Sequence, residues 1–264
     1  MNTPPPLSAN KQKLLYKAHQ KKYRDQLDLY FGEGYRLLTA AFADPATKIL
    51  EIVLSERVLD TEQGSLILRT ATNRKIQIYR STERQMQHLS AEVTAPGIFF
   101  TVAKRLKNSN ELQTGQERVI VFLEQISDAG NLGTILRSMV WFGLKSVVLS
   151  PGCVDAYNPK SVRASAGAIF TANIYANLPF DQAVTRLKPL GYLVIAAVPD
   201  GGQSITEINP ENKILLVFGS EAAGLSESVL KLVDQRLTIP QRGNIESLNL
   251  AVSAGIMFYQ ITKG

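Results

Sequence analysis

Residues 239–255 read IPQRGNIESLNLAVSAG, and they divide into three parts with different physical roles. Ile239 and Pro240 end an extended apolar run, because proline cannot continue a hydrogen-bonded ladder. Residues 241–246 form a polar loop. Ser247 is predicted to cap the helix that follows, whose small residues admit a close neighbour. The stretch fits a ligand-binding loop or a tight structural junction, and alone it favours the junction.

Upstream of this stretch, apolar runs alternate with amphipathic ones. The apolar runs 192–198 and 214–218 are uninterrupted, which is typical of strands buried on both faces of a sheet. Residues 131–142 carry apolar side chains at helical spacing, with Asn131 placed as the helix N-cap. Further strands are predicted at 119–123, 146–149, 171–175 and 237–239, and further helices at 159–166, 180–187 and 226–233. The pattern predicts an α/β fold with a mostly parallel sheet covered by helices on both sides.

Polar segments follow three of these predicted strands, at residues 124–131, 219–221 and 241–249. Because parallel strands end at one edge of a sheet, we expect the three segments to lie together and to form a ligand site. The glycine fingerprints of dinucleotide-binding and P-loop enzymes are missing from the sequence, which argues against a nucleotide-binding oxidoreductase.

The first part of the chain is basic. Residues 1–115 hold 17 Lys and Arg against 11 Asp and Glu, a net charge of +6, whereas residues 116–264 hold 12 of each. A basic segment next to a neutral one predicts a polyanion-binding domain beside a catalytic domain. A basic surface that only contacts solvent would give the same net charge. Helices are predicted at 10–27, 35–43 and 82–89, and strands at 29–31, 49–54, 76–79 and 98–102. This part is therefore predicted to be a small α/β domain.

Residues 107–117 are polar without apolar periodicity, and they predict a linker. We expect a domain at 1–108, a linker at 109–117 and a domain at 118–264. No apolar run approaches a membrane span, and the N-terminus lacks an apolar signal core, so we expect a cytoplasmic protein without membrane contact. With one cysteine and two histidines, a metal site is not expected.

Three motifs resemble those of the SpoU (TrmH) branch of the SPOUT methyltransferases. They read DAGNLGTILRS at 128–138, VFGSEAAGL at 217–225 and IPQRGNIESLN at 239–249, in the order and spacing of that family. Ala129 and Ala222 depart from it, since many relatives have Pro and Gly there. The resemblance implies an S-adenosylmethionine-dependent RNA ribose 2′-O-methyltransferase, with an L30e-like N-terminal domain and a trefoil-knotted α/β-knot C-terminal domain.

The same resemblance implies which residues act. Arg137 matches the catalytic arginine and would clamp the phosphate beside the target ribose. The family resemblance also implies a part in removing the proton, but a guanidinium stays protonated, which favours the phosphate role. Asn131 would orient Arg137 or the ribose, and Glu221 would position the arginine. Ser247 and Asn249 would hydrogen-bond in the substrate pocket. Each of these residues also has a purely structural reading, as a cap or a solvated charge.

The implied cofactor is S-adenosylmethionine, held largely by backbone groups at Gly219, Ile239 and Leu248. The implied partners are RNA and a second copy of the chain, joined through the knot and the small-residue final helix. Ribosomal RNA is favoured over transfer RNA because the first domain is separate. The alternatives are a transfer-RNA 2′-O-methyltransferase, or a non-catalytic RNA-binding or ribosome-assembly factor with a vestigial cofactor pocket.

Residues 31–36, FGEGYR, add to the resemblance, because many relatives carry Glu-Gly-x-Arg at this place. Glu33 would stabilise the positive end of the following helix. Lys160 and Arg163 are candidates for contact with RNA phosphate.

Overall fold

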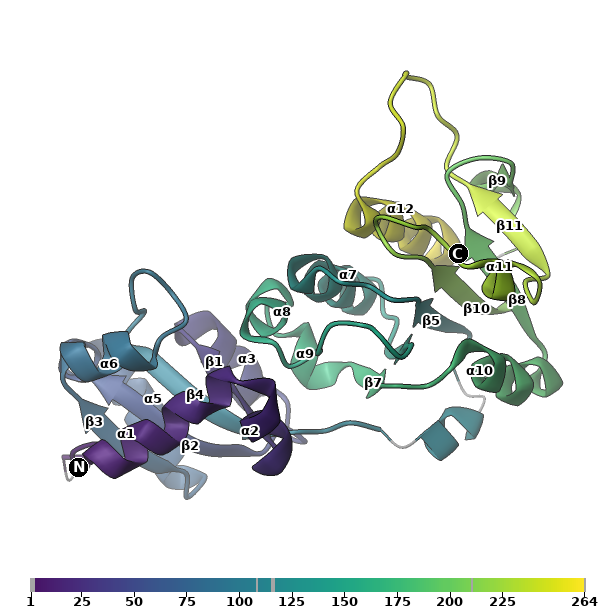
Figure 1. Cartoon of the computed structure of the whole chain (residues 1–264). Helices are drawn as coiled ribbons and strands as arrows, with labels where there is room; N and C mark the ends of the chain where they lie inside the picture. Colours follow the sequence, from purple (N-terminus) through teal and green to yellow (C-terminus); the bar gives the residue numbers. More distant parts are fainter. Residues whose placement is uncertain (1–2, 108, 115–116, 210, 264) are drawn as a thin grey trace. The chain divides into compact units, whose positions relative to one another are not determined.

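The computed structural model describes residues 3–107, 109–114, 117–209 and 211–263 (Figure 1). The chain forms two compact units that do not follow chain order. The first unit combines residues up to Lys104 with Tyr157–Phe170, and the second combines Arg105–Ala156 with the residues from Thr171 onward. The second half of the chain therefore contributes one segment to the first unit.

The first unit contains a mixed four-stranded sheet in the order β1-β4-β2-β3. The strands β1 (Leu29–Glu33) and β2 (Ile49–Ser55) pair antiparallel with β4 (Ile98–Ala103), and β2 pairs parallel with β3 (Gln77–Ser81). All four strands were predicted with bounds within two residues. A buried cluster that includes Phe31, Val53 and Phe99 forms part of the core on this sheet.

The predicted helix over 10–27 is wrong in its continuity. The structure has α1 (Ala9–Tyr16), a 3-10 turn at Lys17–His19 and α2 (Lys21–Gln26), with Gln20 extended between them. The buried guanidinium of Arg24 donates to the carbonyls of Ala18 and His19 at 2.9 and 2.8 Å. These carbonyls accept a side chain in place of the backbone N–H groups of a continuing helix, so the helix breaks there.

Helix α3 (Tyr35–Ala43) lies where it was predicted, but α4 (Glu56–Leu59) and α5 (Glu62–Asn73) were missed. Gly64 in the first turn of α5 weakens the sequence signal for a helix. A Cβ at Gly64 would lie 2.1 Å from the carbonyl oxygen of Val58, so the glycine is needed for close approach of the two helices. A tertiary contact therefore explains a residue that looks unfavourable locally.

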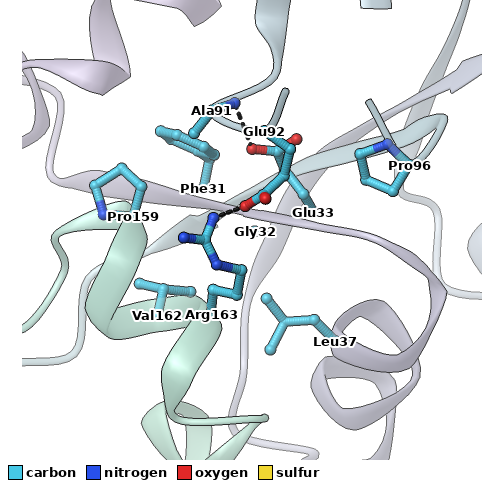
Figure 2. A pocket seen from close by; sticks show the side chains of 10 residues that line it. All are labelled: Phe31, Gly32, Glu33, Leu37, Ala91, Glu92, Pro96, Pro159, Val162 and Arg163. Carbon is cyan, nitrogen blue, oxygen red and sulfur yellow. Dashed lines mark hydrogen bonds and ion pairs between the residues drawn. The ribbon is translucent and has the colours of Figure 1, made fainter. Parts of the chain in front are cut away.

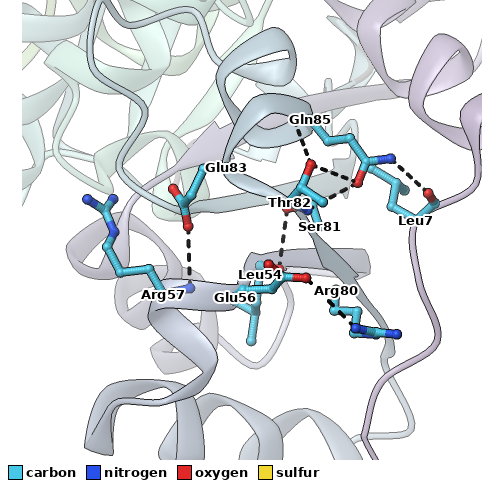
Figure 3. A network of polar contacts seen from close by, with 9 residues as sticks. All are labelled: Leu7, Leu54, Glu56, Arg57, Arg80, Ser81, Thr82, Glu83 and Gln85. Atoms are coloured by element: carbon cyan, nitrogen blue, oxygen red, sulfur yellow. Dashed lines mark hydrogen bonds and ion pairs between the residues drawn. The ribbon is translucent and has the colours of Figure 1, made fainter.

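Helix α6 (Glu83–Leu89) is fixed at its start by a polar network (Figure 3). Thr82 and Gln85 form a reciprocal capping box, and Gln85 Nε2 also donates to the carbonyl of Leu7 at 3.0 Å. The carboxylate of Glu83 accepts from the backbone N–H of Arg57 at 3.3 Å. The network joins the N-terminal segment, α4 and α6 into one support.

Glu33 directly precedes Gly34, the N-cap of α3, and its carboxylate also has partners in another loop. Its carboxylate accepts a hydrogen bond from the hydroxyl of Ser90. It also accepts one from the N–H of Ala91 at 2.8 Å (Figure 2), and so holds the loop after α6. Burial raises the pKa of Glu33, although these two donors and the charge of Arg163 oppose the rise. Arg163 forms an ion pair with Glu92, and both residues line the same cavity. The guanidinium that was a candidate for contact with RNA phosphate is therefore paired with a carboxylate of the same chain.

The second unit is built on a seven-stranded sheet in the order β7-β6-β5-β10-β8-β11-β9, in which every pairing is parallel. This arrangement confirms the predicted α/β class with a mostly parallel sheet. Its strands are β5 (Val119–Leu123), β6 (Ser146–Leu149), β7 (Asn173–Tyr175), β8 (Tyr192–Ala197), β9 (Gln203–Ser204), β10 (Lys213–Phe218) and β11 (Gln235–Thr238).

The helices of the second half of the chain are mostly short. They are α7 (Ala129–Trp141), α8 (Pro159–Ala164), α9 (Ala168–Thr171), α10 (Phe180–Leu187), α11 (Glu227–Leu230) and α12 (Leu250–Thr262), with 3-10 turns at Ser109–Thr114, Lys188–Leu190 and Ile205–Glu207. Helices α8 and α11 end two and three residues before their predicted ends. In the predicted linker, residues 115–116 lie outside the described residues, and Leu112 packs into the core of the second unit. No helix in the described ranges is long and apolar enough to cross a bilayer.

Candidate active site

The three polar segments that the sequence placed together do lie at one edge of the second sheet. Strands β5 and β10 are parallel neighbours, with Leu123 opposite Phe218 at their carboxyl ends. Strand β11 runs parallel to β8, which in turn pairs with β10. Hydrogen bonds between residues of the three segments confirm that the edge gathers them into one site.

Asn131 lies inside α7 and does not cap it, so the predicted cap is wrong. The N-cap is Asp128, whose Oδ1 accepts from the N–H of Asn131 at 2.7 Å. Asp128 and Asn131 are both residues that favour the N-cap position, and Asp128, the first of the two, is the one that caps α7. The amide side chain of Asn131 is thereby left available to the site.

A chain of side-chain hydrogen bonds links Asn249, Asn131 and Glu221. Asn249 Nδ2 donates to Asn131 Oδ1 at 3.1 Å, and Asn131 Nδ2 donates to Glu221 Oε1 at 2.8 Å. The chain has a single direction, because an ionised carboxylate at its end can only accept. Its two amide orientations are therefore set by their surroundings, and the three side chains form one polarised unit.

The other end of this unit is fixed by a helix cap. Asn249, and not Ser247 as predicted, caps α12: its Oδ1 accepts from the N–H groups of Ala251 and Val252 at 2.9 and 3.3 Å. Because Oδ1 serves the cap, only Nδ2 is left to donate to Asn131. Ser247 is exposed and makes no hydrogen bond to another described residue.

Glu221 lies on a tight turn that requires glycine. Ser220 and Gly224 exchange two backbone hydrogen bonds of 3.0 Å, and Gly224 adopts a positive φ of 66°. A Cβ at Gly219 would lie 2.2 Å from the carbonyl carbon of Gly224. We had expected Gly219 to admit the cofactor; its lack of a side chain is already needed by the turn itself.

Sequence reasoning missed the support beneath this turn. Glu124, directly after β5, is 8% exposed and accepts from both the backbone N–H and the hydroxyl of Ser226, at 3.0 and 2.6 Å. A buried carboxylate is stable when it is fully hydrogen-bonded, so this pair ties the end of the Glu221 loop to β5. The sequence feature that could have revealed this role is an acidic residue at the carboxyl end of an apolar strand.

The loop before α12 is open. Residues 241–249 are exposed, and no backbone N–H of 241–248 donates to another described residue. Leu248 is 42% exposed, and Ile239 is half-buried at the start of the loop. Free backbone donors beside exposed apolar surface suit a ligand with polar groups and an adenine face. The residues present therefore fit S-adenosylmethionine.

Arg137 stands apart from the hydrogen-bonded unit. It is exposed on α7, and within the described ranges it makes no hydrogen bond or ion pair. Asn131 and Glu221 bond to each other, and Asn131 to Asn249, rather than to this guanidinium. That Asn131 orients Arg137 or the ribose, and that Glu221 positions the arginine, therefore stay predictions. The guanidinium remains available to a phosphate.

An open groove of about 550 Å³ runs between α7 and α12. Asn131 and Asn249 stand in its lining, and Val252, Ile256 and Tyr259 of α12 line it with exposed apolar surface. Trp141 at the end of α7 is 82% exposed. Large apolar side chains at this exposure are characteristic of interaction surfaces.

A metal cluster and a reactive cysteine are two further features for which the described residues can be searched. No group of three or more His, Cys, Asp or Glu side chains there could hold a metal ion. Burial raises the pKa of the thiol of Cys153, which donates to the carbonyl of Leu123 at 3.3 Å, so this cysteine is a poor nucleophile.

Residues 118–259 match the SpoU rRNA Methylase family. The 23S rRNA (guanosine(2553)-2′-O)-methyltransferase RlmP of Bacillus subtilis is 30% identical over 93% of this chain and 93% of its own length. An uncharacterized tRNA/rRNA methyltransferase of Synechocystis is 38% identical over 55% of this chain. This chain spans about half of that relative, 53%.

The fold is also found in solved structures. The structure of an AdoMet-bound rRNA methyltransferase from Sinorhizobium meliloti matches with a TM-score of 0.85 and 25% identity, over 98% of this chain and 96% of that one. The match covers both compact units. With its three motifs at one sheet edge, this chain belongs to the SpoU rRNA Methylase family.

Proposed function

We propose that this protein is an S-adenosylmethionine-dependent methyltransferase that modifies a ribose 2′-hydroxyl of ribosomal RNA. The observation that carries the proposal is the Asn249–Asn131–Glu221 unit beside an open loop with free backbone donors. The relative from Bacillus subtilis, which aligns over nearly the whole chain, is named as a 23S ribosomal RNA 2′-O-methyltransferase. This similarity supports ribosomal over transfer RNA.

S-adenosylmethionine supplies an electrophilic methyl group on a positively charged sulfur. The chain must place the ribose oxygen in line with that methyl and hold the neighbouring phosphate. Arg137 is proposed to bind the phosphate as a planar, always charged fork. The open loop is proposed to hold the cofactor, with Gly219, Ile239 and Leu248 along its binding surface.

The polarised unit is proposed to face the substrate. Glu221 has a second carboxylate oxygen that can accept from a ribose hydroxyl, while Asn131 fixes the first. Ser247, exposed and without a described partner, can donate or accept in the same pocket. These roles position the ribose, and they leave the final proton acceptor to a group in the assembled complex.

The protein is further proposed to work as a homodimer, with the α7–α12 groove as the contact. Exposed Trp141, Val252, Ile256 and Tyr259 give this face apolar surface, and Gly255 lets a partner approach closely. The resemblance also implies a trefoil knot in this domain. Residues 1–108 are proposed to bind RNA through their basic charge, and the site of action is proposed to be the cytoplasm.

Methyl transfer to RNA tests the proposal. The protein is incubated with methyl-labelled S-adenosylmethionine and total cellular RNA, which is then size-fractionated and digested to nucleosides. Label in 2′-O-methylated nucleosides from ribosomal RNA is the expected result. Label in transfer RNA alone would favour the transfer-RNA alternative. Cofactor binding without label in any RNA would favour the assembly-factor alternative.

A further inference from the structure

Five planar rings form a continuous column in the first unit. In order they are Phe99, Phe31, His19, Tyr16 and His88, with successive ring centroids 4.9, 4.7, 4.9 and 4.6 Å apart. The inner end is core, since Phe99 and Phe31 are 0% and 2% exposed. The outer end is surface: Tyr16 is 42% exposed and His88 is exposed. The ring contacts thus run from the core out to solvent, stacked at both ends of the column and tilted by 40° and 33° on either side of His19.

The outer rings are held in place by their helices. Tyr16 ends α1 and His88 lies in α6, and Gln12 Nε2 of α1 reaches the carbonyl of Gln85 in α6 at 3.5 Å. The network at the start of α6 anchors that helix to the N-terminal segment (Figure 3). His19 is fixed by a 2.8 Å contact between Nε2 and the carbonyl of Leu89. A stack held from two helices is preorganised, so a ligand would not have to order it.

The geometry of the last pair suits one more ring. Tyr16 and His88 are stacked with an interplanar angle of 19°, and such near-parallel stacking is how planar heteroaromatic groups pack. Unpaired RNA bases are recognised mainly by stacking on aromatic and histidine side chains, whereas bases within a duplex are not accessible. A nucleobase would extend the column as a sixth ring.

The charge around the outer rings fits an RNA backbone. Lys13 lies three residues before Tyr16 on α1, and Arg84 lies four residues before His88 on α6, so each shares a helix face with its ring. Both cations are exposed, and neither forms an ion pair with a described residue. In contrast, Lys11 on α1 pairs with Glu51 at 2.6 Å. Cations beside an aromatic platform are the usual combination in single-strand binding.

We propose that Tyr16 and His88 form a stacking platform for an unpaired nucleobase of the RNA that this enzyme binds. The inference rests on the proposed function and deepens it, because it assigns single-stranded or loop RNA, and not duplex, to the first unit. The platform lies in residues that the family match at 118–259 does not include.

The test uses the full-length protein and a 12-nucleotide single-stranded RNA that carries one 2-aminopurine, whose fluorescence falls on stacking. Its blunt duplex is the second probe. Tyr16→Ala and His88→Ala are expected to weaken single-strand binding by about 5- to 150-fold, and to abolish the fluorescence change. His88→Phe keeps a ring and is expected to retain both the single-strand affinity and the fluorescence change.

Two control variants separate stacking from other effects. Leu14→Ala removes a side chain of similar exposure, 40%, from the same helix without touching the column, and is expected to bind as wild type. Lys13→Ala is expected to weaken single-strand and duplex binding alike and to lower the salt dependence. Thermal unfolding of each variant checks the fold; His88 is at the exposed end, so its truncation leaves the core rings in place.

The platform is overturned if the wild type binds the single strand without quenching, or if His88→Ala and Tyr16→Ala bind it as tightly as Leu14→Ala. The second result would leave the rings to packing or to a protein partner. Failure of the proposed function is seen separately, as absence of methyl transfer by the wild type to any RNA. Transfer without stacking would refute the platform alone.

Discussion

Two regions at the carboxyl edge of the second sheet differ in how many of their polar groups are hydrogen-bonded within the chain. The Asn249–Asn131–Glu221 unit is closed by hydrogen bonds of 2.8 and 3.1 Å and by a helix cap. The loop at 241–248 has exposed side chains and backbone donors that no described residue uses. One region is organised before any ligand arrives, and the other is built to be completed by one.

This difference separates two tasks of the site. Groups that must act in the transition state gain most from being fixed beforehand, because no reorganisation is then needed during the reaction. Groups that hold a cofactor must open to admit it and can gain order on binding. Substitutions inside each region and outside both test this separation, in order of decreasing expected effect.

The largest effect is expected from Arg137, which belongs to neither region. Arg137→Ala should lower methyl transfer by about 100- to 1,000-fold, since the charge that is proposed to hold the phosphate in the transition state is lost. Cofactor affinity and thermal stability should stay unchanged, because Arg137 has no described partner. Rates, cofactor titration and thermal unfolding measure the three quantities. Lys145→Ala, at an exposed cation outside the site, is the control; equal activity of the two variants would contradict the assignment.

The next effect concerns the turn beneath Glu221. Gly219→Ala should destabilise the protein by about 2–3 kcal/mol, because the new Cβ would overlap the backbone of Gly224. Gly243→Ala in the open loop should be tolerated, because nothing lies within 4 Å of a Cβ there. Denaturant unfolding compares the two. Similar losses for both variants would show that the turn is less tightly packed than the structure indicates.

Two substitutions of Asn249 can distinguish its role as the helix cap of α12 from its role in the site. Asn249→Asp keeps an oxygen for the cap of α12 but loses the donor to Asn131, so stability should hold while methyl transfer falls about tenfold or more. Asn249→Ala should also lose about 1 kcal/mol of stability through the missing cap. Unfolding and rate measurements on both variants test this. An active Asn249→Asp enzyme would show that the hydrogen-bonded unit is only structural.

The smallest effect concerns Glu33 in the first unit. Its raised pKa, caused first by burial, means that the folded protein holds the proton more tightly than the unfolded chain. At low pH both states are protonated and nothing is lost; as the pH rises above the ordinary value of 4.5, the folded state loses stability. Wild type should therefore become less stable relative to Glu33→Gln in denaturant unfolding as the pH rises from 4 to 7. A wild type that keeps or gains stability relative to Glu33→Gln over this range would contradict the assigned burial.

The sequence was most informative where local signals and packing agree. Helix α10 at Phe180–Leu187 and strand β5 at Val119–Leu123 were predicted to the residue, because strong apolar periodicity or continuity leaves little choice. The meeting of three polar segments at one edge followed from parallel strands alone. Their chemistry was implied by the family resemblance, and their residue-level contacts were not.

The errors occurred where several residues of the same type compete for one role. Asp128 and Asn131 can both cap α7, and Ser247 and Asn249 can both cap α12. The outcome depends on contacts between distant segments: Asn131 is engaged by Glu221, 90 positions away, and by Asn249. Helix propensity carries no information on such partners, and Arg24, which breaks the first helix, acts in the same way.

Amide hydrogen exchange with and without S-adenosylmethionine tests the central contrast most directly. The cofactor should slow exchange across residues 241–248, whose N–H groups lack described partners, and should leave the first turns of α7 and α12 nearly unchanged. Bound cofactor without protection of the loop would contradict its assignment as the cofactor site. Strong new protection at Asn131 and Asn249 would instead show that the hydrogen-bonded unit forms only on binding.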